Sequence, residues 1–140
     1  MSFFPSSLSA FTNTLSPLQN LMSCLAVGLG GFLGSLLRYA MTFIPLKSKS
    51  GFPWITLITN VLGCLFIAWI CSRIDGQSHP RLMLFLKVGL CGGFTTFSTL
   101  ALESQQLLRQ GRLDLALAYI ASTLILGIAC IFLVEALHAL

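Results

Sequence analysis

The sequence predicts an all-α membrane protein with four transmembrane helices, the third of them broken at mid-membrane. Three observations predict this fold class. Of the 140 residues, 56% are hydrophobic and only 9% are charged, with a mean hydropathy of +0.90, whereas a soluble domain carries about 25% charged residues. Four apolar segments are each long enough to cross a bilayer, which takes about 20 residues. Adjacent glycines and a group of hydroxyl residues interrupt the third segment.

The low charge excludes two classes of protein. A soluble enzyme needs a charged, wetted surface, and no nucleophile and base form a recognisable catalytic pair. A nucleic-acid-binding protein needs a basic stripe, which this chain lacks. The net charge of +4 is interpreted as charge that flanks the spans. The five cysteines include no CxxC motif and are interpreted as packing residues.

The chain divides into a polar N-terminal tail, residues 1–20, and a transmembrane domain, residues 21–140. The tail is rich in Ser, Thr, Asn and Pro, and it lacks the basic residues that begin a secretory signal. The spans are expected at about residues 21–44, 53–71, 82–108 and 115–137. Short polar connections separate them, so neighbouring helices should run antiparallel.

The basic residues are divided almost evenly between the two sides of the membrane. The side of the first and third loops has Lys47, Lys49, Arg109, Arg112 and, near a span end, Arg38; the other side has Arg73, Arg81 and Lys87. A bias of about two charges specifies orientation only weakly. Either the chain has a single topology with the first and third loops cytoplasmic, or both orientations occur and an antiparallel dimer can form.

Small and polar residues inside the spans are the informative ones. In the first span, Gly30 and Gly34 share a face with Arg38, and the glycine spacing permits another helix to approach closely. Arg38 either snorkels to the membrane surface or caps the carbonyls of a broken helix. In the second span, Thr56 and Asn60 face the same way. The Asn60 amide either joins two helices or donates N–H groups to a passing solute.

The third span reads GLCGGFTTFSTL over residues 89–100. Glycine costs about 1 kcal/mol relative to alanine in a helix, and threonine is also a poor helix former. The sequence therefore predicts a break at mid-membrane, whose freed backbone groups cannot face lipid. These groups either pair with neighbouring helices or line an ion site, and the concentration of hydroxyl residues favours the ion site.

The polar set inside the spans favours an anion. Glu103 and Glu135 lie toward span ends, so no carboxylate lies near a span centre. Hydroxyl and amide groups can donate hydrogen bonds, and the edge of the Phe97 ring is weakly positive. Freed carbonyls in the same break could hold one fixed cation, which would favour an anion nearby. In the fourth span, Tyr119 and Thr123 share a face that is either a packing face or a polar track.

Three segments carry a resemblance to a known family. They are GGFLGSLLRY at 30–39, TLITNVLG at 56–63, and GGFTTFST at 92–99 followed by Glu103. In this order and spacing they resemble the CrcB/Fluc fluoride channels, and the resemblance covers about residues 25–135.

The resemblance implies a channel that lowers cytoplasmic fluoride by passive export across the bacterial inner or plasma membrane. Family members are antiparallel dimers of four-span subunits, with two pores at the subunit interface, and a homodimer is expected here. The Asn60 amide and the Phe97 ring edge would contact fluoride. Further pore-side or polar-track positions would be Thr56, Ser98, Tyr119 and Thr123.

The resemblance also implies a structural sodium ion that is not transported. The backbone carbonyls of Gly92 and Thr95 would hold it on the dimer axis. Arg38 and Glu103 match the family's usual basic and acidic residues, with no role assigned.

Two alternatives remain open at the level of sequence. Leu100 stands where the family usually has a second Phe, and Gly127 stands where a hydroxyl residue is often found. Both departures would suit one subunit of a paired, heterodimeric channel. A small proton-coupled multidrug exporter also has four spans, but it needs a central carboxylate in its first span, and this chain has none there.

Overall fold

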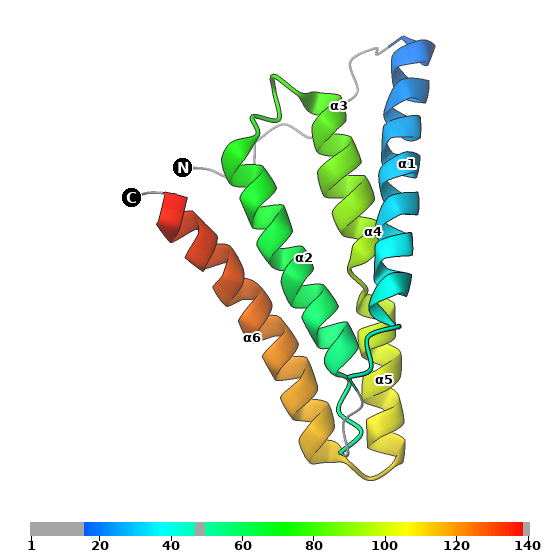
Figure 1. Cartoon of the computed structure of the whole chain (residues 1–140), viewed down its shortest axis with the longest axis vertical. Coiled ribbons are helices and arrows are strands. Elements are labelled where there is room, and N and C mark those ends of the chain that lie inside the picture. Colours follow the sequence, from blue (N-terminus) through cyan, green and yellow to red (C-terminus); the bar gives the residue numbers. More distant parts are fainter. Residues whose placement is uncertain (1–15, 47–49, 139–140) are drawn as a thin grey trace.

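The computed structural model describes residues 16–46 and 50–138, and this part of the chain is all helical. Its elements are α1 (Pro17–Met41), α2 (Trp54–Arg73), α3 (Pro80–Met83), the π-helix η2 (Leu84–Cys91), α4 (Gly92–Phe94), α5 (Phe97–Arg109) and α6 (Leu113–His138). Four spans in the described part are long and apolar enough to cross a membrane, and α3 to α5 together make the third (Figure 1). The predicted four-span fold with a bent third helix is confirmed.

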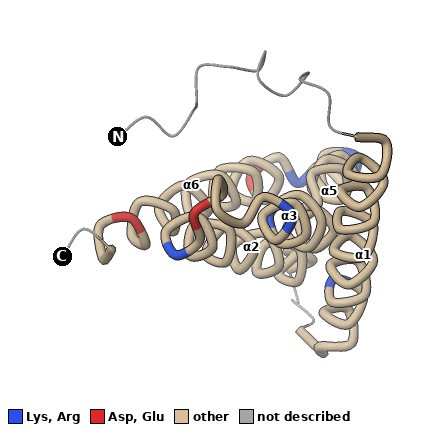
Figure 2. The backbone as a smooth tube through the Cα atoms, turned by 90° about the horizontal axis from the view of Figure 1, so that it is seen from above, with Lys and Arg blue, Asp and Glu red and all other residues tan. Residues whose placement is uncertain are grey.

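The packing of the four spans does not follow their order in the sequence. The third span lies along α1 through η2 and α4, and α6 lies along α2 (Figure 1). Large apolar side chains remain exposed along all four spans, which suits a surface that faces lipid. Charged residues are few along the tube in Figure 2.

Helix α1 begins at Pro17, earlier than the predicted start at residue 21. Ser16 caps it, because the Ser16 hydroxyl accepts a bond from Gln19 N at 3.4 Å and the Gln19 amide oxygen accepts one from Ser16 N at 3.1 Å. This reciprocal pair satisfies two amides at the helix start, and proline at the first helical position is compatible with it. The rest of the predicted tail, residues 1–15, lies outside the described residues.

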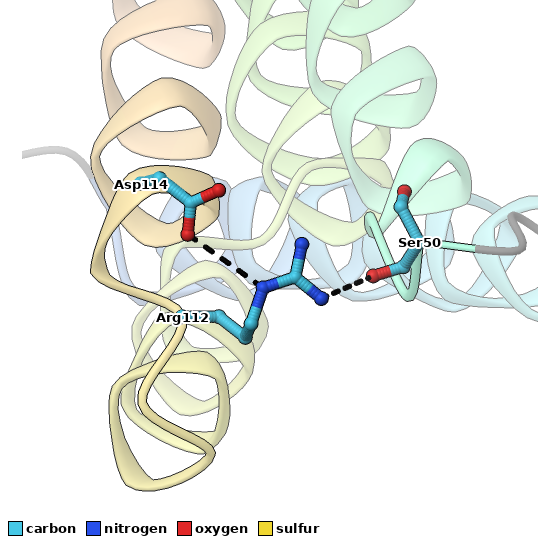
Figure 3. A network of polar contacts seen from close by, with 3 residues as sticks. All are labelled: Ser50, Arg112 and Asp114. Atoms are coloured by element: carbon cyan, nitrogen blue, oxygen red, sulfur yellow. Dashed lines mark hydrogen bonds and ion pairs between the residues drawn. The ribbon is translucent and has the colours of Figure 1, made fainter.

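The first and third loops lie at the same end of the bundle. Arg112 donates from Nη1 to the carbonyl of Ser50 at 3.4 Å, and its Nε lies 3.6 Å from Oδ1 of Asp114 (Figure 3). The exposed ion pair adds little stability, but the contacts bring the start of α6 next to the chain that leads into α2. The prediction that these loops share one side is confirmed for the described residues, which do not include Lys47 and Lys49.

The Gly30–Gly34 face of α1 is in backbone contact with the third span. A Cβ atom added at Gly30 would clash with the Phe85 carbonyl and lie 2.9 Å from Leu90 N. One added at Gly34 would clash with the Leu90 carbonyl. The close helix approach predicted from the GxxxG spacing is therefore present.

We expect Gly30→Ala to lower the melting temperature of the detergent-purified protein, since the methyl group overpacks this contact at a cost of roughly 1–3 kcal/mol. Gly28→Ala is the matched control, because Gly28 is exposed on the same helix and an added Cβ would meet nothing within 4 Å. Alanine there should leave the melting temperature equal or slightly higher. Equal melting temperatures for the two variants would contradict the close packing.

Candidate functional site

The third span is broken at Thr95 and Thr96. Both residues have extended backbone, with φ/ψ of −79°/158° and −150°/115°, and separate α4 from α5. The break follows the glycine pair rather than falling on it. Gly93 serves a different purpose, because an added Cβ there would lie 3.1 Å from Gly31 Cα. Glycine at 93 therefore permits contact with α1, and the two threonines form the break.

Asn60 of α2 bonds to the opened backbone. Its Oδ1 accepts from Thr96 N at 2.8 Å, and its Nδ2 donates to the Thr96 carbonyl at 3.3 Å. Both partners are buried. The Asn60 amide therefore supplies the two hydrogen bonds that the Thr96 N–H and carbonyl would make with neighbouring turns in a continuous helix. Of the two interpretations of Asn60, the structure shows the amide joining two helices. An amide nitrogen has two N–H groups, and this contact uses one of them.

The Thr96 hydroxyl caps the start of α5. It accepts a bond from Thr99 N at 3.2 Å and donates to Thr99 Oγ1 at 2.9 Å. The Ser98 hydroxyl lies 3.3 Å away from it. A threonine at this position satisfies an amide that would otherwise lack a partner at the helix N-terminus.

The break leaves the Gly92 and Thr95 carbonyls without their usual donors. In a continuous helix these carbonyls would accept from Thr96 N and Thr99 N. Those two amides instead donate to Asn60 Oδ1 and to the Thr96 hydroxyl. The two carbonyls are therefore open to another partner, and the oxygen chemistry fits a hard cation.

Glu103 joins three helices on the same side of the break. Its carboxyl group accepts from Thr56 Oγ1 of α2 at 3.0 Å and from the Tyr119 hydroxyl of α6 at 2.6 Å. Tyr119 is fully buried, so its hydroxyl needs an internal partner. The hydroxyl protons of Thr56 and Tyr119, both predicted pore-side residues, are engaged with Glu103 in this conformation.

A polar pocket of about 430 Å³ opens beside this cluster. It lies between the C-terminal end of α1, the N-terminal end of α2, and α5. Its lining consists mostly of hydroxyl residues together with one basic and one acidic side chain: Ser35, Arg38, Tyr39, Thr42, Ile55, Thr56, Thr59, Thr96, Thr99 and Glu103. The pocket combines hydroxyl groups with both charges and ends at the break.

Phe97, Ser98 and Thr123, also predicted as site residues, do not line this pocket. Phe97 has 79% of its surface exposed, and Ser98 is also exposed, both on the first turn of α5. Thr123 is buried and donates its hydroxyl proton to the Tyr119 carbonyl at 2.7 Å. Because the hydroxyl proton is used in this bond within the helix, Thr123 does not donate it to a solute in this conformation.

The two departures from the family pattern each have a local structural explanation. Leu100 is 5% exposed and belongs to the core cluster with Leu57, Leu107, Ala116 and Tyr119. A Cβ added at Gly127 would lie 3.0 Å from Cys64 Sγ. The absence of a side chain at 127 thus leaves room for the Cys64 thiol.

Sequence reasoning did not single out several pocket residues, among them Ser35, Tyr39, Thr59, Thr96 and Thr99. A signal for some of them was available. Thr59 follows Thr56 by three residues, and Tyr39 follows Ser35 by four, so each pair shares a helix face. The role of Thr96 depends on a contact with α2 that no local pattern reveals.

The fold and site define a four-span membrane protein with a broken third helix and a polar pocket at the break. The profile of the family described as "CrcB-like protein, Camphor Resistance (CrcB)" matches residues 25–134. The chain belongs to this family.

Several curated relatives are similar over most of their length. A protein of Phocaeicola vulgatus is 44% identical over 115 residues, which cover 79% of this chain and 93% of the relative. Proteins of Flavobacterium psychrophilum (41% over 105 residues, covering 73% and 85%) and Thermus thermophilus (44% over 111 residues, covering 78% and 89%) are similarly close. Each of the three is named "Fluoride-specific ion channel FluC".

Proposed function

We propose that this protein is a fluoride-selective ion channel of the cell membrane, not an enzyme, which lets fluoride leave the cytoplasm by passive electrodiffusion. The observation that carries the proposal is the 44% identity to a protein named as a fluoride-specific channel, over nearly all of that protein. The chemistry of the site supports it, because hydroxyl and amide donors line the region of the break without a carboxylate at mid-span. Such donors suit a small, hard anion.

The residues at the break would form the fluoride path. The second N–H of Asn60 and the edge of the exposed Phe97 ring would contact the anion, with Ser98 beside them. Thr56, Tyr119 and Thr123 would contribute only after turning their hydroxyl protons away from the acceptors that now hold them. Hydroxyl groups can rotate in this way because each has a single O–H bond to reorient.

The open carbonyls of Gly92 and Thr95 would hold a structural sodium ion that is not transported. Their usual amide donors are engaged elsewhere, which supports this assignment. When bound, the ion would supply a fixed positive charge close to the anion path. A second copy of the chain around the same ion would present the same two carbonyls.

The functional unit would be an antiparallel homodimer. The nearly even division of basic residues between the two sides of the membrane supports insertion in both orientations. The high exposure of Phe97 supports a partner or a pore at that face. A homodimer is favoured over paired unlike subunits, because packing within this chain accounts for both Leu100 and Gly127.

Fluoride efflux from liposomes that hold the purified protein tests the proposal. We expect fluoride release when a potassium ionophore is added to vesicles loaded with potassium fluoride. Vesicles loaded with potassium chloride should release no more chloride than vesicles without protein. Absence of fluoride release would refute a channel formed by this chain alone, and equal release of both anions would refute its selectivity. Expressing this chain alone also tests the homodimer, because a channel that requires an unlike partner would release no fluoride.

A further inference from the structure

A second cavity, of about 200 Å³, lies at the opposite end of the bundle from the polar pocket. It is a groove between α2, η2 and α6, where the C-terminal ends of α2 and α6 lie (Figure 1). Its polar rim consists of Ser72, Lys87 and Glu135, and its apolar floor includes Ile67, Ala68 and Ile131. We call it the α2–α6 groove.

The groove lies at the depth of a membrane surface. Ser72 is the last residue but one of α2, and Glu135 lies three residues before the end of α6, which is about 4.5 Å along a helix. Lys87 lies deeper on its helix, but a lysine side chain extends toward the interface. The half-exposed Trp69 on α2 is of the type that anchors helices at this level. The rim is therefore at headgroup depth, and the floor runs into the hydrocarbon region.

The rim carries one positive and one negative group that do not pair with each other. Lys87 and Glu135 both line the groove, yet the structure records no ion pair between these two described residues. Charged residues within membrane spans usually pair with an opposite charge, and Lys87 and Glu135 both lie within spans. A ligand with a phosphate and an ammonium group on one apolar chain would match the rim and the floor together.

We propose that the α2–α6 groove binds a phospholipid with a phosphoethanolamine headgroup. Lys87 receives the phosphate, Glu135 receives the ammonium group, and an acyl chain lies along Ile67, Ala68 and Ile131. The Ser72 hydroxyl joins the phosphate after its proton turns away from the Trp69 carbonyl, to which it now donates at 2.8 Å. The carboxyl group of Glu135 gives the site its selectivity. A primary ammonium donates hydrogen bonds to it, whereas a phosphocholine headgroup has no N–H and a phosphoglycerol headgroup has no positive charge.

Native mass spectrometry of the full chain in detergent tests this proposal. The protein is mixed with equal amounts of phosphatidylethanolamine, phosphatidylcholine and phosphatidylglycerol that share the same acyl chains. We expect the wild-type chain to retain phosphatidylethanolamine about tenfold more than the other two, as one charge-assisted contact of about 1.4 kcal/mol would give. Glu135→Gln should remove this preference, and Lys87→Gln should lower retention of all three lipids.

Arg81→Gln is the matched control, because Arg81 is exposed at the start of α3 and lies outside the groove. It should keep the wild-type pattern. Equal retention of the three lipids by the wild-type chain would overturn the proposal, and so would a preference for phosphatidylglycerol, which indicates a simple anion site. An unchanged preference in folded Glu135→Gln would overturn it as well. The wild-type comparison needs no variant to fold, and lipid retention is measured independently of fluoride flux.

Discussion

Asn60→Asp should reduce fluoride efflux at least about tenfold. Asp keeps an acceptor for Thr96 N, but it places a second oxygen where Nδ2 now donates to the Thr96 carbonyl at 3.3 Å. Loss of that bond leaves a buried carbonyl without a partner at a cost of roughly 1–3 kcal/mol, which disturbs the local geometry of the break. Each 1.4 kcal/mol by which the barrier to conduction rises slows efflux about tenfold. The new negative charge would also repel an anion at the break. Liposome efflux of equal amounts of folded protein measures the effect.

Asn20→Asp makes the same chemical change at an exposed position on the first turn of α1. A carboxylate there is favourable at a helix N-terminus, so the efflux rate should match that of the wild type. Wild-type efflux by Asn60→Asp would argue that neither the amide nor its bond to Thr96 matters for conduction. A loss in both variants would show that added negative charge, rather than its place, stops the channel.

The overall fold could be predicted from the sequence because its determinants are local. Span length, the GxxxG spacing on α1 and the poor helix propensity of residues 92–96 all act within one helix. The start of α1 could also have been found, since Ser16 and Gln19 have the spacing of a capping box. The break was expected near the glycines, but Gly93 permits a close contact with α1 and the break falls on the two threonines that follow. The position of the break depends on tertiary contacts.

The polar residues of the site could be predicted from the sequence, but most of the hydrogen bonds between them could not. Asn60 and Thr96 are 36 residues apart, and their pairing exists only because α2 lies beside the break. Glu103 had no assigned role, because nothing in its own helix indicates that Thr56 and Tyr119 donate to it. Those bonds follow from the packing of three helices. Sequence therefore identified the polar residues, and packing decided which of them bond to each other.

Tyr119→Phe should lower the melting temperature clearly more than Tyr39→Phe. Tyr119 is fully buried, and its hydroxyl donates to Glu103 at 2.6 Å. Its loss leaves a half-buried carboxyl group with one donor fewer. Tyr39, the other tyrosine of the chain, has 62% of its surface exposed, so water can replace any bond that its hydroxyl makes. Thermal unfolding in detergent measures both variants, and equal shifts would argue against a structural bond at Glu103.

The coupling between Tyr119 and Glu103 can be isolated with a double-mutant cycle of Tyr119→Phe and Glu103→Gln. Glutamine keeps the size of the side chain, but its Nε2 is a donor and cannot accept from a hydroxyl. One of the bonds from Thr56 and Tyr119 is therefore lost in the single Glu103→Gln variant. If the Tyr119 bond is the one lost, the double variant should be little worse than Glu103→Gln alone. The coupling free energy should be about 0.6 kcal/mol and no more than about 1.7 kcal/mol, as double-mutant cycles give for hydrogen bonds between membrane helices. Where a structure of Glu103→Gln shows that the Tyr119 bond is the one lost, strict additivity of the two changes would contradict a stabilising role for that bond.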